Sequence, residues 1–234
     1  MGLYTWFSGL GSYQKTSVII GSCAVFCGTG YCVYKLYSRR RKVELFDESP
    51  NNGQEPKPAV QKRVLVLGLQ GCGKTTFLTA LANLGSGAGG NETKPTEGFN
   101  VMCVTTNGVH LNIWEIGGGE KVQNYWSKFT ADTDLLIYMV DSCDTQHFAE
   151  AKDKLNELLK DPCLQNVPLI ILASKQDKTG ARSVSVLRNI LDVDSLLNDR
   201  SVECFGIQIS PLGPELQGIE IVQNSILKFC MEAD

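Results

Sequence analysis

The chain has 234 residues, 43% of them hydrophobic, and a formal net charge of -3, which suits one ordinary domain with an appendage. Residues 1–42 carry +6, from six Lys or Arg and no Asp or Glu, so the total of -3 leaves -9 for the rest. Because a nucleic-acid-binding protein needs a basic face on its folded part, we expect no nucleic acid among the partners.

Residues 16–34 contain no charged side chain, and Lys or Arg follow at positions 35 and 39–42. An uncharged stretch of about 19 residues can cross a bilayer core as a helix, and positive charges collect on its cytosolic side. We therefore predict a short N-terminal segment at 1–15, a single transmembrane anchor at 16–37 and a cytosolic remainder. The short anchor and its basic flank suit the mitochondrial outer membrane or the endoplasmic reticulum.

Three other interpretations of this leader stay open. A cleaved signal peptide has its basic residues before the apolar stretch, whereas here most of them follow it. A myristoylated helix needs Gly2, which is present, and Ser or Thr at the sixth position, which is Trp6. A buried core helix would need apolar flanks. The next residues, 38–59, are basic, then polar and proline-containing, which predicts a basic flank and a flexible linker.

An apolar strand, a glycine-bearing turn and an amphipathic helix follow in residues 63–84, RVLVLGLQGCGKTTFLTALANL. Gly68, Gly73, Lys74 and Thr75 have the spacing of a phosphate-binding loop. Glycines let backbone N–H groups turn towards a phosphate, and the helix N-terminus adds a positive dipole end. We expect Lys74 to reach the β- and γ-phosphates and the Thr75 hydroxyl to bind Mg²⁺.

Strands and helices alternate through the rest of the chain, which predicts one α/β domain over residues 60–234. Asn107-Gly108 is the strongest short-range signal for a hairpin. Apolar strands between helices predict a mostly parallel six-stranded sheet with one antiparallel edge hairpin and helices on both faces. The predicted strands are 63–67, 100–106, 109–114, 134–140, 169–174 and 202–209, and the helices are 74–84, 148–160, 183–191 and 218–231.

Ligands of such sheets bind beyond the carboxyl ends of the strands, where four further segments stand out. They are PTEGFN at 95–100, WEIGG at 114–118, SKQD at 174–177 and ISP at 209–211. With the phosphate loop, and in this order, they resemble the small GTPases of the ADP-ribosylation-factor and factor-like (Arf/Arl) family over residues 61–232. The leader has no counterpart in typical members, so the chain is similar to a divergent, membrane-anchored one.

The resemblance implies a P-loop small-GTPase fold that binds GTP or GDP with Mg²⁺. Thr96 would bind Mg²⁺ and sense the γ-phosphate, which the Gly118 N–H would also contact. Asp177 would accept two hydrogen bonds from guanine, a pattern that adenine lacks. The phosphate-binding residues implied are Gly71, Cys72, Gly73, Lys74, Thr75, Thr76, Thr96 and Gly118. The guanine-binding residues are Ser174, Lys175, Asp177, Ser210 and Pro211, and the metal ligands are Thr75, Thr96 and Glu115.

Four positions depart from the family pattern. Glu115 replaces an aspartate and is one methylene longer, so the water-mediated contact with Mg²⁺ must shift. Gly119 replaces the glutamine that orients the attacking water, which leaves no catalytic residue to assign. Ser174 replaces the asparagine that ties the base-binding loop to the phosphate loop. Pro211 has no N–H where a backbone donor meets guanine, unless a neighbouring residue supplies it.

The nine cysteines are scattered without a C-x-x-C pair, and His110 and His147 have no ligand partner nearby in the sequence. This pattern indicates a reducing compartment with free thiols rather than a disulfide framework or a zinc site.

We therefore predict a membrane-anchored, Arf-like guanine-nucleotide-binding protein that recruits effectors in a GTP-dependent way, with weak or absent intrinsic hydrolysis. Effector and regulator proteins are its expected partners. A second hypothesis, favoured by Ser174 and Pro211, is a pseudo-GTPase, an interaction module with little or no nucleotide binding. A small kinase acting on adenine nucleotides would need an arginine-rich lid, and residues 119–160 contain no arginine.

Overall fold

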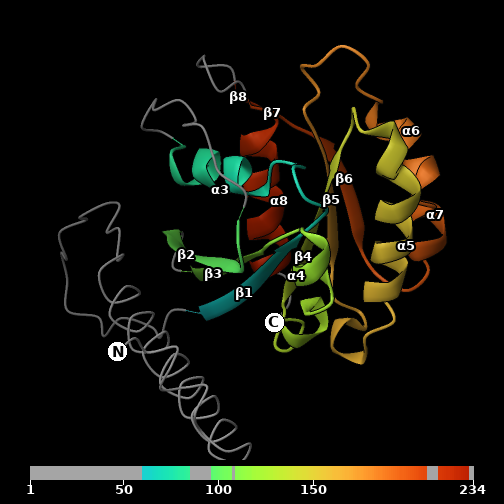
Figure 1. The fold of residues 1–234 in the computed structure, drawn as a ribbon. Coiled ribbons are helices and arrows are strands. Elements are labelled where there is room, and N and C mark those ends of the chain that lie inside the picture. The colour runs from blue at the N-terminus through green and yellow to red at the C-terminus, as the bar shows by residue number, and fades with distance from the viewer. Residues whose placement is uncertain (1–59, 85–95, 107–108, 210–215, 232–234) are drawn as a thin grey trace, which may run out of the picture. The chain divides into compact units, whose positions relative to one another are not determined.

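The structure is a computed structural model that describes residues 60–84, 96–106, 109–209 and 216–231. Six strands form one sheet in the order β2-β3-β1-β4-β5-β6 (Figure 1). They are β1 (Val60–Leu67), β2 (Phe99–Thr106), β3 (Val109–Ile116), β4 (Leu135–Asp141), β5 (Leu169–Ser174) and β6 (Val202–Gly206). β2 runs antiparallel to β3, and the other neighbouring strands pair in parallel. The predicted sheet and its antiparallel edge are confirmed.

Helices cover both faces of this sheet, as Figure 1 shows. On one face lie α3 (Lys74–Ala82) and α8 (Ile219–Met231), which contact each other. On the other lie α5 (Phe148–Leu158), α6 (Val184–Ile190) and α7 (Val193–Leu196). The shorter described elements are α4 (Glu120–Gln123), η1 (Trp126–Lys128), η2 (Thr145–His147), η3 (Pro162–Leu164), β7 (Gln208–Ile209) and β8 (Leu216–Gln217).

The central strands are buried on both faces, which explains why they read as continuous apolar runs. Successive side chains of a strand point to opposite faces. In β1, Val64 is buried in one cluster with Phe77 of α3, and Leu65 in the other with Leu155 of α5. The loop that follows β1 is therefore held at the end of a strand fixed between two packed layers.

Two elements differ from the sequence prediction. The strand expected at 202–209 ends at Gly206. After Ile207, the two residues of β7 pair with β8 instead of β5. The helix expected at 183–191 ends at Ile190, and the short helix α7 follows it. Asp192 has a φ of 56, a left-handed conformation that a right-handed helix cannot include.

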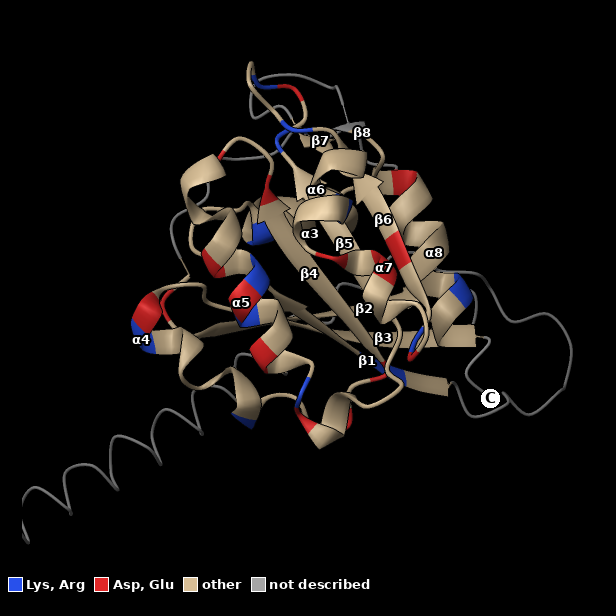
Figure 2. Cartoon of the chain, turned by 90° about the vertical axis from the view of Figure 1, so that its right-hand side faces the viewer, with Lys and Arg blue, Asp and Glu red and all other residues tan. Residues whose placement is uncertain are grey.

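No helix among the described residues is both long and apolar enough to cross a membrane. The predicted segments at 1–15, 16–37 and 38–59 lie outside the described residues. In Figure 2, the segments coloured for Lys and for Asp or Glu are interspersed along α5, so this helix carries charges of both signs.

Candidate functional site

The loop between β1 and α3 curls around the side chain of Lys74. The Lys74 Nζ donates hydrogen bonds to the carbonyl oxygens of Gly68, over 2.7 Å, and Leu69, over 3.0 Å. Gly71 and Gly73 have φ values of 77 and 90, a left-handed conformation that glycine adopts without strain. Glycines in this conformation let successive backbone N–H groups point into the loop, which is what a phosphate cradle requires.

Three oxygen-bearing side chains from separate segments meet at the start of α3. Thr75 is the second residue of α3, Thr96 precedes β2 and Glu115 lies near the end of β3. Thr75 Oγ1 lies 2.9 Å from Thr96 Oγ1 and donates a hydrogen bond to Glu115 Oε1. Thr96 donates to the same Glu115 oxygen over 3.1 Å. The structure thus brings together the three predicted metal ligands, and this all-oxygen donor set fits Mg²⁺.

This cluster is not a self-contained metal centre. Among the described residues, no group of three or more His, Cys, Asp or Glu side chains could hold a metal ion. Glu115 contributes a fully buried carboxylate, and Thr75 and Thr96 contribute neutral hydroxyls. A cation bound here would need further oxygens from a ligand such as a phosphate, which the adjoining loop is built to hold.

The loop after β3 lies against the phosphate loop at Gly118. A Cβ on Gly118 would lie 2.4 Å from the Gly68 carbonyl oxygen, so a side chain fits only if the backbone shifts. Gly117 donates its N–H to the Gly98 carbonyl oxygen over 2.8 Å, which joins this loop to the segment that follows Thr96. The two segments that hold Thr96 and Gly118, the predicted contacts of the γ-phosphate, therefore lie against each other and against the phosphate loop.

Gly119 is under no such constraint. A Cβ there would lie 3.5 Å from Gln70 Oε1, an ordinary van der Waals distance. Its φ of -71 and ψ of 149 belong to extended backbone that any residue adopts. Gln123 of α4 donates its side-chain amide to the Gly118 carbonyl oxygen over 2.9 Å, so it holds the loop. Packing thus does not require a glycine at position 119. The side chain of Gln123 already donates to the Gly118 carbonyl oxygen.

Ser174 links the loop after β5 to the phosphate loop. Its buried hydroxyl donates to the Cys72 carbonyl oxygen over 2.7 Å, with the Val140 carbonyl oxygen 3.2 Å away. Serine therefore makes the link that the replacement of asparagine put in doubt. Lys175, next in the chain, has a φ of 60, and its Nζ lies 2.5 Å from the Asp141 carboxylate.

The remaining predicted residues differ in their exposure. Asp177 is exposed on the loop after β5, and Thr76 is half-buried in the first turn of α3.

Burial raises the pKa of the Cys72 thiol, and the nearby Lys74 only partly offsets this, so the thiol stays neutral. Ser210 and Pro211 lie outside the described residues, and their contacts with guanine stay a prediction.

An aromatic cluster that the sequence did not lead us to expect lies close to Thr96 in the chain, around Phe99. Phe99 stacks on Trp114 with ring centroids 5.6 Å apart, and Phe129 packs against them at 5.7 and 6.4 Å. Phe99 is nevertheless 44% exposed. The signal lay in the hairpin register: Val101 pairs with Trp114, which makes Phe99 a diagonal neighbour of Trp114 on the same face.

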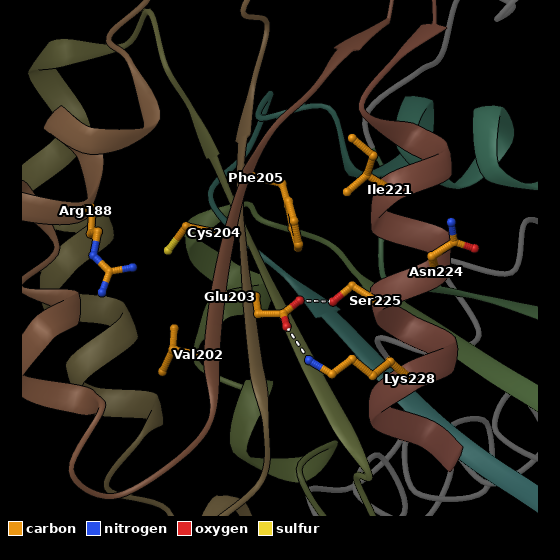
Figure 3. A pocket seen from close by; sticks show the side chains of 9 residues that line it. All are labelled: Arg188, Val202, Glu203, Cys204, Phe205, Ile221, Asn224, Ser225 and Lys228. Atoms are coloured by element: carbon orange, nitrogen blue, oxygen red, sulfur yellow. Dashed lines mark hydrogen bonds and ion pairs between the residues drawn. The ribbon is translucent and has the colours of Figure 1, made fainter. Parts of the chain in front are cut away.

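A shallow hollow lies along β6 and α8 (Figure 3). Glu203 accepts hydrogen bonds there from the Ser225 hydroxyl and, over 3.0 Å, from Lys228 Nζ. Burial by itself raises the pKa of Glu203, but these hydrogen bonds and the Lys228 charge outweigh it and hold the pKa below its usual value. None of the residues predicted to bind nucleotide lines this hollow. We therefore assign these paired charges to the stability of the fold.

A profile of the ADP-ribosylation factor family matches residues 54–225, which include the phosphate loop and all the predicted site residues. The chain belongs to the ADP-ribosylation factor family. It is 39% identical over 136 residues to ADP-ribosylation factor-like protein 3 of Chlamydomonas reinhardtii, covering 58% of this chain and 75% of that protein. It is 36% identical over 177 residues to ADP-ribosylation factor-like protein 10 of Mus musculus, covering 74% of this chain and 70% of that protein.

A solved member of the family has the same fold. The Arl6 BBS3 small GTPase of Trypanosoma brucei, with the nucleotide analogue GppNp bound, aligns with a TM-score of 0.65 at 22% identity. The alignment covers 75% of this chain and 100% of that chain. The resemblance inferred from the motifs is therefore confirmed for the family and for the small-GTPase fold.

Proposed function

We propose that this chain is a membrane-anchored guanine-nucleotide-binding switch that recruits effector proteins when GTP is bound and hydrolyses GTP weakly or not at all. The observation that carries the proposal is the meeting of Thr75, Thr96 and Glu115 beside the phosphate loop. These side chains come from three segments, and a nucleotide with Mg²⁺ would hold the three together. Mg²⁺ bound there would neutralise charge on the β- and γ-phosphates.

The switch would act through the two segments that connect to the phosphate loop. Thr96 and Gly118 belong to separate loops, and each would contact the γ-phosphate or its metal. Loss of the γ-phosphate would remove both contacts and release both loops. Phe99 lies three residues after Thr96 and exposes a large aromatic ring, so its cluster with Trp114 is our candidate surface for an effector.

Guanine selection is proposed for the loop after β5. The exposed Asp177 carboxylate would accept two hydrogen bonds from guanine, and the stem of Lys175 would lie over the base. The Ser174 bond to Cys72 supports this assignment, because it fixes the base loop relative to the phosphate loop.

Weak hydrolysis follows from Gly119. Even Ras, which has the water-orienting glutamine, turns over unaided at only about 10⁻⁴ s⁻¹. Glycine has no side chain to orient a water, and the amide of Gln123 is bonded to the loop itself. We therefore expect nucleotide exchange and binding partners, rather than intrinsic hydrolysis, to set the lifetime of the GTP state.

Stoichiometric guanine nucleotide in the purified protein tests the proposal. Full-length protein would be purified in detergent and denatured, and the released nucleotide would be identified by chromatography, with Lys74→Ala as the control. We expect GTP or GDP from the parent and none from the variant. No nucleotide from the parent, together with no thermal shift on adding GTP and Mg²⁺, would instead support the pseudo-GTPase.

The membrane anchor is proposed for residues 16–37, with residues 1–15 across the membrane, a linker at 38–59 and the domain at 60–234 in the cytosol. The bilayer would be the mitochondrial outer membrane or the endoplasmic reticulum. Carbonate extraction of cells should leave the full-length protein in the membrane pellet. Release into the supernatant would remove this part of the proposal.

A further inference from the structure

The Glu115 carboxylate contacts the two threonine hydroxyls directly. Glu115 Oε1 accepts hydrogen bonds from both Thr75 and Thr96, whose own oxygens lie 2.9 Å apart. Three oxygens from three segments thus form a closed triangle. The other carboxylate oxygen, Oε2, accepts a hydrogen bond from the Asn100 side-chain amide over 3.4 Å. This bond turns Oε2 away, so the carboxylate presents a single oxygen to the triangle.

Two edges of this triangle match the oxygen spacing in the coordination shell of Mg²⁺. Magnesium binds six ligands in a near-ideal octahedron at about 2.0–2.1 Å, which places neighbouring ligand oxygens about 2.9 Å apart. The separation of the threonine oxygens is 2.9 Å, and that between Thr96 Oγ1 and Glu115 Oε1 is 3.1 Å. Two of the three edges therefore have the spacing of neighbouring ligands in such an octahedron, whereas the third, between Thr75 Oγ1 and Glu115 Oε1, is shorter.

The charge of the site also favours a bound cation. Glu115 is fully buried, and its hydrogen-bond donors are two hydroxyls and an amide, all of them neutral. No Lys or Arg of the described chain lies within ion-pair distance of it; Lys74 Nζ is bonded to the Gly68 and Leu69 carbonyls. Burial of an unpaired carboxylate is costly, and a bound cation removes that cost.

We propose that Glu115 Oε1 binds Mg²⁺ directly, in the same coordination shell as Thr75 and Thr96. This inference rests on the proposed nucleotide binding. An aspartate at this position is shorter by one C–C bond, about 1.5 Å, and would hold the metal through a water. The extra methylene of Glu115 brings the oxygen itself to the place of that water. The metal consequently keeps one water fewer and gains a negatively charged ligand.

The number of waters on the metal tests this assignment. Full-length protein would be loaded with Mn²⁺ and GppNp, and the broadening of the Mn²⁺ EPR signal in H₂¹⁷O would count the bound waters. Two phosphate oxygens and three protein oxygens leave about one place of six for water. One water in the parent is the expected result, and two waters would overturn the direct contact without any variant being made.

A matched pair of variants sharpens the test. Glu115→Asp should gain one bound water and need about tenfold more Mg²⁺ to slow nucleotide release. Glu97→Asp makes the same chemical change at an exposed position one residue after Thr96, and should behave like the parent. Equal water counts in the parent and Glu115→Asp would reject the inference but leave nucleotide binding intact. A parent that binds no Mn²⁺–GppNp at all would reject both.

Discussion

The Ser174 hydroxyl donates a hydrogen bond to the Cys72 carbonyl oxygen over 2.7 Å, joining segments 102 positions apart in the chain. Cys72 belongs to the phosphate loop, and Ser174 opens the loop proposed to select guanine. The hydroxyl is buried, so this protein contact is what holds the two loops in register. Their relative position decides whether one nucleotide can reach both, because the bonds between the base and the phosphates limit how far apart these groups can lie.

Removing this hydroxyl should loosen nucleotide binding. A buried neutral hydrogen bond is worth about 0.5–1.5 kcal/mol, so we expect Ser174→Ala to release guanine nucleotide up to about tenfold faster. Stopped-flow dissociation of a fluorescent GDP analogue measures this. The control is Ser185→Ala, an exposed hydroxyl on α6 that should leave the rate unchanged. Equal rates for Ser174→Ala and the parent would show that the link is dispensable.

Gly119→Gln should speed up GTP hydrolysis. A side chain can begin at this position without a clash, because a Cβ there meets only an ordinary contact with Gln70 Oε1 at 3.5 Å. With an amide to orient water, we expect single-turnover hydrolysis to rise by about tenfold or more. Gly119→Met has a similar length without the amide and should stay at the parent rate. If both variants are equally fast, the gain does not come from a positioned water.

Gly118→Ala should damage the site although it adds only one methyl group. The new Cβ would lie 2.4 Å from the Gly68 carbonyl oxygen, and both loops are held by further hydrogen bonds. Overpacking of this kind costs about 1–3 kcal/mol, so GppNp affinity should fall about ten- to hundredfold. The same substitution one residue later, Gly119→Ala, meets no clash and should bind as the parent does. Equal affinities in a competition titration would contradict this account.

The sheet was predictable because each central strand has a recognisable apolar pattern in its own local sequence. The central strands β4 and β5 are buried on both faces, so a run such as Leu169–Ser174 is apolar almost throughout. The break at Asp192 was not predicted from the local pattern. Its left-handed backbone precedes Val193, which is buried in the core, and that burial is a tertiary contact.

The site was predictable in its residue types but not in its contacts. Motif spacing located Lys74, Thr75 and Glu115, because a phosphate loop and a metal ligand each have a characteristic local pattern. The Ser174 bond to Cys72 joins distant segments, so whether serine could reach across depended on the distance between two loops. That distance depends on the registers of β1 with β4 and of β4 with β5, which the local sequence does not determine.

Glu203 should make the stability of the fold depend on acidity. Burial raises its pKa, but the bonds from Ser225 and Lys228 dominate and lower it below the usual 4.5. A carboxyl whose pKa is lower in the folded state than in the unfolded state stabilises the fold at pH values above its unfolded-state pKa. This contribution is lost as the pH falls through the folded-state pKa. Denaturant unfolding should therefore show a loss of stability between about pH 5 and pH 3.

Ser225→Ala isolates the contribution of this carboxyl. The variant should be less stable than the parent by about 1 kcal/mol at pH 7, and the difference should shrink as Glu203 becomes protonated. Ser195→Ala is the control, because the Ser195 hydroxyl donates to the neutral carbonyl oxygen of Asp192. Its effect on the free energy of unfolding should not change with pH. A Ser225→Ala difference that is the same at pH 3 and pH 7 would mean that the charge of Glu203 contributes nothing.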